Sequence, residues 1–127
     1  MKIRHFRRLY SGVPILSAAL ILLLLCPAGA AAHGPQGIKL TYDASAQTLQ
    51  AAITHSPFSA SHYIERVEVK KNGKVATVEN ISDQSAGTFT YAVKIAAVPG
   101  DVLEVKATCS RVGSKTETLT VGPAKAR

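Results

Sequence analysis

Hydrophobic and polar residues are distributed in two different ways along the chain. Residues 13–26 form an almost uninterrupted apolar run, whereas from residue 33 onward apolar residues alternate with polar ones in short runs. Alternation with a period of two is typical of β-strands with one buried face, and no segment after residue 33 keeps a helical period over ten residues. The pattern therefore predicts an all-β domain behind an apolar leader.

Four alternating runs define the predicted strands most clearly. They are Leu49, Ala51 and Ile53; Phe89, Tyr91, Val93 and Ile95; Leu103, Val105 and Ala107; and Leu119 and Val121. We expect the residues of each run to face the interior of the domain, because successive side chains of a strand point to opposite faces.

Turn-forming residues separate these runs. Asn72-Gly73 lies between two strand-like segments and supplies the two positive φ angles that a tight hairpin turn requires. Further turns are expected at Asp43-Ala44-Ser45, at Pro99-Gly100-Asp101 and at Gly113. About seven strands, spaced by roughly 10 to 14 residues, are typical of an immunoglobulin-like β-sandwich.

The apolar run has the features of a secretory signal peptide. Basic residues precede it, and the small residues Ala28 to Ala32 follow it. Its length of about 14 residues falls short of the roughly 20 that a membrane anchor, the alternative, requires. We therefore expect a signal peptide over residues 1–32, cleaved after Ala30 or Ala32, and a periplasmic or secreted protein. The sandwich is expected over residues 33–122, with a loose C-terminal tail over residues 123–127.

The charge of the chain is concentrated in the leader. The formal charge is +7, from 15 Lys and Arg against 8 Asp and Glu, but four of the cations lie within the first eight residues. The remainder has 11 cations, 8 anions and a net charge of +3, without the basic patch of a nucleic-acid-binding protein. We expect no nucleic-acid partner and no membrane partner after signal cleavage. A redox or carrier protein is the kind of partner that fits.

Histidine and cysteine carry the candidate chemistry beyond the leader. The segment contains His33, His55, His62 and a single cysteine, Cys109, so it can form no internal disulfide. Neither a nucleophile elbow nor a glycine-rich phosphate loop is present. The candidate residues are therefore ligands for a metal ion, and imidazole with thiolate suits iron, copper or zinc.

The predicted strands bring these residues toward one end of the sandwich. His55 follows one strand and His62 precedes the next, with a short loop between them. Cys109 continues the alternation of Leu103, Val105 and Ala107, which directs its sulfur toward the interior. In the alternative interpretation the histidines are solvated and Cys109 is a small buried apolar residue.

The segment from His55 through His62-Tyr63-Ile64-Glu65 to Lys74 resembles the iron-binding domain of desulfoferrodoxins and superoxide reductases. His33-Gly34-Pro35 and Pro99-Gly100-Asp101 with Cys109 also resemble motifs of that family, and the likeness covers residues 33–115.

This resemblance implies an immunoglobulin-like fold and a ferrous ion that reduces superoxide. His33, His55 and His62 would be equatorial ligands of the iron, and Cys109 would be the axial ligand. Val112 stands where the family has its fourth histidine, so the implied ligand set is incomplete. The sequence thus predicts an exported metal-binding redox domain, with non-haem iron as the metal.

Two alternatives to this function stay open. Asn72-Gly73-Lys74 and the last predicted hairpin also resemble a subunit of the periplasmic thiosulfate-oxidising carrier complex, which implies a metal-free interaction module with Cys109 in its core. Alternatively, cleavage after Ala32 would make His33 the first residue, and its α-amine and imidazole together would favour copper.

Overall fold

The computed structural model describes residues 33–123, which form a sandwich of two antiparallel β-sheets. The predicted signal peptide and residues 124–127 of the predicted tail lie outside the described residues. Residues 33–123 contain seven strands: β1 (Gly37–Asp43), β2 (Thr48–Thr54), β3 (Ile64–Lys71), β4 (Lys74–Asn80), β5 (Thr88–Lys94), β6 (Val102–Cys109) and β7 (Ser114–Thr120).

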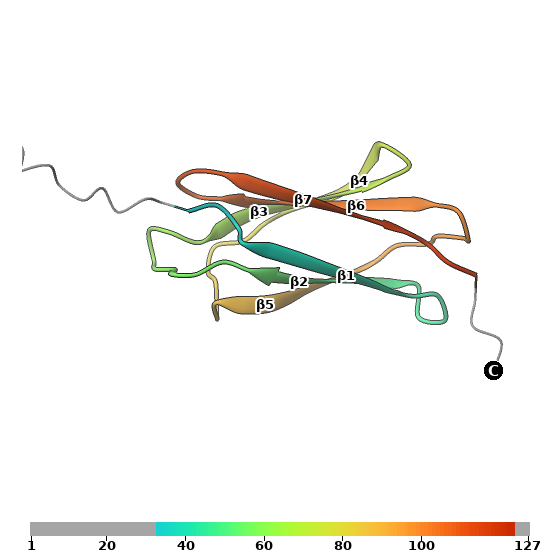
Figure 1. The fold of residues 1–127 in the computed structure, drawn as a ribbon, viewed down its shortest axis with the longest axis horizontal. Coiled ribbons are helices and arrows are strands. Elements are labelled where there is room, and N and C mark those ends of the chain that lie inside the picture. The colour runs from blue at the N-terminus through green and yellow to red at the C-terminus, as the bar shows by residue number, and fades with distance from the viewer. Residues whose placement is uncertain (1–32, 124–127) are drawn as a thin grey trace, which may run out of the picture. The chain divides into compact units, whose positions relative to one another are not determined.

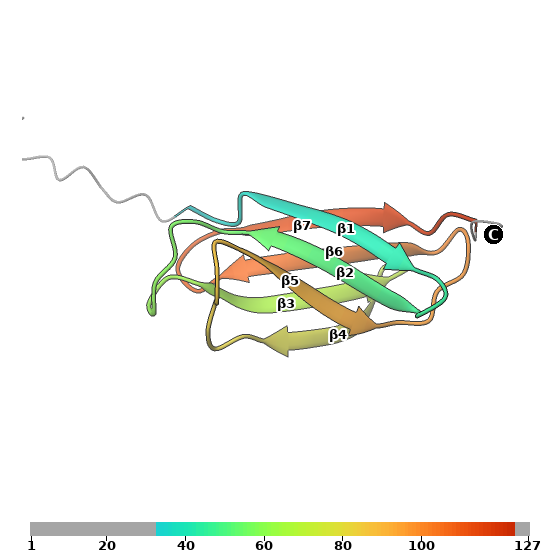
Figure 2. The ribbon, with the colours of Figure 1, turned by 90° about the horizontal axis from the view of Figure 1, so that it is seen from below.

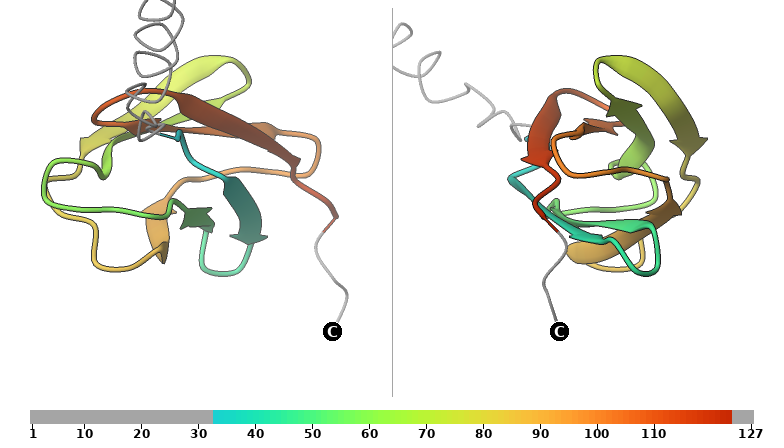
Figure 3. Two further views of the ribbon diagram at one scale, coloured as in Figure 1. Left: turned by 60° about the vertical axis from the view of Figure 1, so that its left-hand side comes forward. Right: turned by 90° about the vertical axis from the view of Figure 1, so that its right-hand side faces the viewer.

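The strands are divided into a three-stranded sheet with the order β1-β2-β5 and a four-stranded sheet with the order β4-β3-β6-β7. Figure 1 shows the two sheets as separate layers, and Figure 2 shows the three-stranded sheet lying over the four-stranded one. Strands β1 and β7 contact each other and link the layers along one side (Figure 3). The all-β sandwich predicted from the alternating pattern is therefore confirmed.

Among the described residues, no helix is long and apolar enough to cross a membrane.

The core lies between the two sheets and follows the predicted alternation. The side chains of Leu49, Ala51 and Ile53 in β2 and of Leu103, Val105 and Ala107 in β6 are fully buried. Burial of each large aliphatic side chain contributes about 1.5 to 3 kcal/mol. In β5, Tyr91 is buried while Phe89 and Val93 are only partly buried against the core, because β5 is an edge strand.

The predicted hairpin turn is present between β3 and β4. Asn72 and Gly73 have φ angles of 50° and 77°, and Lys71 pairs with Lys74 across the turn. The other predicted turns are also observed: Asp43 Oδ1 accepts hydrogen bonds from the backbone of Ser45 and Ala46, and Gly113 has a φ of 92°. Turn chemistry in the sequence therefore located the strand ends correctly.

Strand directions bring several chain segments to one end of the sandwich. Thr54 at the end of β2 pairs with the starts of β1 and β5, and Ile64 at the start of β3 pairs with Cys109 at the end of β6. The loops that continue from these residues lie together at the left-hand end of Figure 1. The histidines and the cysteine of residues 33–123 lie in or beside these loops.

Candidate metal centre

His55, His62 and Cys109 form a cluster at this end of the sandwich. One ligand atom from each residue lies within 4.8 Å of the others, and the cluster could hold a metal ion. The two imidazole rings meet edge to face, with centroids 4.7 Å apart. His55 and Cys109 are almost inaccessible, at 1% and 3% exposure. Three of the four residues predicted from the sequence are thus brought together, two of them buried and His62 half-buried.

Backbone hydrogen bonds hold each of these residues in place. His55 follows β2 directly, and its N–H donates to the carbonyl of Gly87 at 2.7 Å. His62 exchanges two backbone hydrogen bonds with Ser59, at 2.8 and 2.9 Å, which close the loop just before β3. Cys109 is the last residue of β6, and its N–H donates to Gly113 at 3.0 Å. The ligand atoms are therefore carried by strand ends and a tight loop.

Gln84 is a buried polar residue that contacts His55. Its Nε2 donates to the carbonyl oxygens of His55 and Ala86, at 2.8 and 2.7 Å. Its Oε1 accepts the backbone N–H of Ile64 at 3.1 Å and lies 2.9 Å from Nδ1 of His55. Three backbone groups therefore fix the orientation of the amide, so the oxygen faces the histidine ring.

This orientation determines the tautomer of His55. Because the oxygen of Gln84 is only an acceptor, Nδ1 of His55 must carry a proton and donate it. In the neutral ring Nε2 then holds a lone pair. That nitrogen lies 3.2 Å from the carbonyl oxygen of His33, so two acceptors face each other unless a second proton or a cation joins them. A histidine that donates its other N–H to an oxygen is the usual arrangement at metal sites.

Nε2 of His62 is buried and has no hydrogen-bond partner among the described residues. Leaving such a group unsatisfied costs about 1 to 3 kcal/mol. A metal ion would satisfy it, because the neutral imidazole nitrogen is a good donor to transition metals. This unsatisfied nitrogen is the strongest observation in favour of a metal ion at the cluster.

The sulfur of Cys109 accepts a hydrogen bond from the backbone N–H of Arg111 at 3.4 Å. The thiolate is the form of cysteine that binds metals. The guanidinium of Arg111 also donates to the carbonyl oxygen and the hydroxyl of Ser61, both at 2.9 Å. Arg111 therefore ties the loop that carries His62 to the turn that follows Cys109.

His33 contributes its backbone, since its side chain is exposed and lies outside the cluster. Its carbonyl oxygen faces His55, as described above. The next residue, Gly34, packs so closely on Gly113 that a Cβ at Gly34 would lie 3.2 Å from two backbone atoms of Gly113. The imidazole of His33 as a ligand thus stays a prediction.

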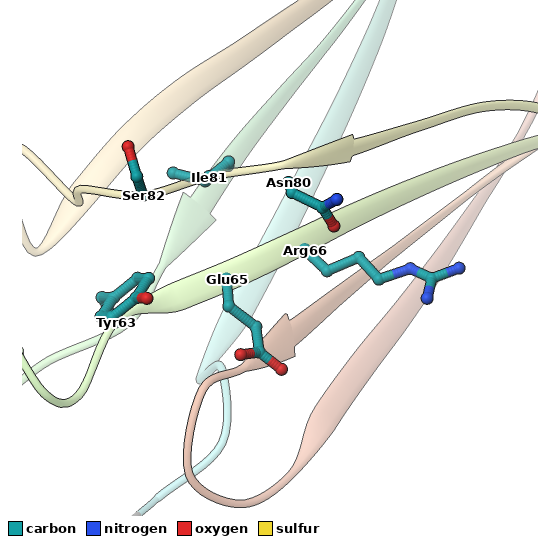
Figure 4. Close-up of a pocket in the computed structure, with 6 residues that line it drawn as sticks. All are labelled: Tyr63, Glu65, Arg66, Asn80, Ile81 and Ser82. Carbon is teal, nitrogen blue, oxygen red and sulfur yellow. The ribbon is translucent and has the colours of Figure 1, made fainter.

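A surface pocket lies beside the start of β3 but carries no comparable chemistry. It is lined by Tyr63, Glu65, Arg66, Asn80, Ile81 and Ser82. In Figure 4 the carboxylate of Glu65 and the guanidinium of Arg66 point away from each other. Arg66 forms an ion pair with Glu68 at 3.1 Å. The lining therefore offers a single carboxylate and no convergent set of ligands.

No protein-family model matches the chain, and no curated protein matches it significantly. The function must therefore be argued from the cluster itself. A buried imidazole, a half-buried imidazole and a buried thiol lie within 4.8 Å of one another, with a carbonyl oxygen beside one ring, and this group could hold a metal ion.

Sequence reasoning missed Gln84 and Arg111. Gln84 lies in a segment without a strand or helix pattern. The sequence alone does not distinguish a buried glutamine from an exposed one. Arg111 is two residues beyond Cys109, and this proximity was the one signal that could have pointed to it.

Proposed function

We propose that this protein is an exported domain that binds one transition-metal ion through His55, His62 and Cys109. The observation that carries the proposal is the orphaned Nε2 of His62, which lies in a cluster with a second imidazole and a thiol. Gln84 supports it by holding a proton of His55 on Nδ1, so that Nε2, beside the carbonyl oxygen of His33, is the nitrogen of that ring that could bind a metal.

The resemblance to superoxide reductases favours iron as the metal, but that chemistry uses four histidine nitrogens and one thiolate. The cluster supplies two imidazoles and one thiol. Residue 112 is an exposed valine in this chain and cannot supply a nitrogen. The proposed function is therefore metal binding.

Metal content of the protein exported by its own host tests the proposal. We expect close to one equivalent of a transition metal in the wild-type protein and less than a tenth in Cys109→Ser. Val105→Ala is the matched control, because it also alters a buried side chain on the inward face of β6 but leaves the cluster intact. Metal below a tenth of an equivalent in the wild-type protein contradicts the proposal.

A metal-free interaction module is the second candidate. Strand β4 pairs only with β3, and its Val75 and Val78 are 58% and 42% exposed. An exposed edge strand with apolar side chains could dock a partner protein. The same metal analysis separates the candidates, since this module would contain no metal and would be unaffected by Cys109→Ser except in stability.

A further inference from the structure

We infer that the bound ion is copper, held by His55, His62 and Cys109 with the backbone carbonyl oxygen of His33 as a weak fourth neighbour. This inference rests on the proposed function, because it names the metal for the same cluster. It differs from both the iron site implied by the resemblance and a copper chelate built on the α-amine of His33.

The donor set is the first argument for copper. Two imidazoles and one thiolate form a trigonal set, and such a set with a distant, weak oxygen neighbour is typical of copper sites that exchange single electrons. Copper also binds nitrogen donors more tightly than the other divalent metals of its row. Thiolate in addition suits cuprous ion, so the same ligands accommodate both oxidation states.

The carbonyl of His33 is the second argument. Its oxygen lies 3.2 Å from Nε2 of His55, and in the neutral ring, with the proton on Nδ1, both atoms present lone pairs to each other. A cation between these two lone pairs removes their repulsion. The separation of 3.2 Å places the carbonyl oxygen beside the nitrogen at which a metal would bind.

The same features disfavour zinc and iron. Structural zinc is held by four good donors, and catalytic zinc by three donors and a water. Here the fourth neighbour is a neutral carbonyl, and His55 and Cys109 are buried. Non-haem iron prefers six positions or an open face with carboxylate. The cluster within residues 33–123 contains no carboxylate.

The carbonyl is held in place by the segment that leads into β1. Gln36 forms hydrogen bonds through its side chain with both the N–H and the carbonyl of Ser56, the residue after His55. On the other side, Gly34 lies against the backbone of Gly113. These contacts tie the His33 carbonyl to the two segments that carry His55 and Cys109.

Metal competition is the direct test. The full-length precursor is exported, the mature protein is purified and stripped of metal anaerobically, and cuprous, ferrous and zinc ions are titrated against each other. We expect one copper per protein, bound at least about tenfold more tightly than zinc or iron. Retention of zinc or iron against equimolar copper overturns this inference but leaves the proposed function standing. Binding of none of the three overturns both.

The cupric form gives a second readout that does not depend on affinity. Thiolate bound to cupric ion produces an intense visible charge-transfer band, which we expect in the wild-type protein and not in Cys109→Ser. His33→Ala should keep both the band and the copper, because the backbone carbonyl is unchanged. Loss of copper in His33→Ala would assign the imidazole or its chelate as the ligand and overturn the carbonyl assignment.

A glycine substitution tests the carbonyl by moving it, and a second one serves as the control. A Cβ at Gly34 lies 3.2 Å from backbone atoms of Gly113, so Gly34→Ala should displace the carbonyl by a few tenths of an ångström and shift the band while one copper stays bound. Gly37→Ala is the matched control on the same segment, because its Cβ meets only the side chain of Thr54 at 3.9 Å. Identical spectra for wild type and Gly34→Ala would show that the carbonyl does not contact the metal.

Discussion

Oε1 of Gln84 lies 2.9 Å from Nδ1 of His55, and the same oxygen accepts the N–H of Ile64 at 3.1 Å. One buried side chain therefore links the residue after β2 to the first residue of β3. Because β2 and β3 belong to different sheets, Gln84 also joins the two layers at the end that carries the metal ligands. The position and the tautomer of His55 depend on this contact.

Replacement of Gln84 by alanine should weaken both folding and metal binding. It leaves the N–H of Ile64 and Nδ1 of His55 without their acceptor, and we expect a loss of about 2 to 4 kcal/mol in the free energy of unfolding. Metal affinity should fall by about 10- to 100-fold, as when the outer partner of a ligating histidine is lost. Denaturant unfolding of the metal-free protein and metal titration measure the two effects.

Gln50→Ala is the control for this prediction. Gln50 is exposed on β2, so the same change of residue type there should alter the free energy of unfolding by less than about 0.5 kcal/mol. Metal affinity within a factor of two of wild type in Gln84→Ala would show that Gln84 does not set the tautomer of His55.

The sandwich could be predicted from the sequence because the features that define its strands and turns are local. Alternation in β2 and β6 identifies buried residues one strand at a time, and Asn72-Gly73 specifies a turn by its own backbone preferences. Cys109 was also placed correctly in the interior, since it continues the alternation of β6.

The metal centre could be predicted only in part, because its remaining contacts are non-local. Gln84 reaches His55 across 29 positions of sequence, and Arg111 reaches Ser61 across 50. The contribution of His33 comes from its carbonyl oxygen, which every residue type possesses. Neither kind of contact leaves a pattern in residue types.

A side chain at Gly73 should destabilise the β3–β4 turn. Its φ of 77° lies in the left-handed region, and a Cβ there would meet no atom within 4 Å. Gly73→Ala should therefore cost about 1 kcal/mol through backbone strain alone. Gly122→Ala, which also meets no atom within 4 Å and has no such φ, should change the free energy of unfolding by less than half as much. Equal effects of the two substitutions in urea unfolding would contradict this explanation.

Asp101 should make the stability of the fold depend on acid pH. Hydrogen bonds from the side chain of Asn72 and the backbone of Val98, with the nearby ammonium of Lys71, lower the pKa of this carboxyl from 3.8 to about 2. Because its pKa is lowered, the carboxyl takes up a proton at a lower pH in the folded state than in the unfolded state. The stabilisation is therefore complete above about pH 4 and is lost as the pH falls through about 2.

Asp101→Asn should thus be less stable than the wild-type protein at pH 7, and the difference should shrink as the pH falls from 4 to 2. Urea unfolding at a series of pH values measures it. Asp83→Asn, in an exposed loop, is the control for loss of one negative charge. A difference between Asp101→Asn and wild type that stays constant down to pH 2 would exclude the carboxylate as its source.

His62 should show opposite effects on stability and on binding. In the metal-free protein its buried Nε2 has no partner among the described residues, so His62→Leu removes an unsatisfied polar atom and should leave the free energy of unfolding unchanged or raise it by about 1 kcal/mol. With metal at about 100 times its dissociation constant, the wild-type protein should gain about 2.7 kcal/mol, and His62→Leu should gain almost nothing. The free energies of unfolding of the wild-type protein and of His62→Leu, each measured with and without metal, are the four values to compare. A histidine that served only the fold would give the reverse result, with His62→Leu destabilised in the absence of metal and the metal-induced gain preserved.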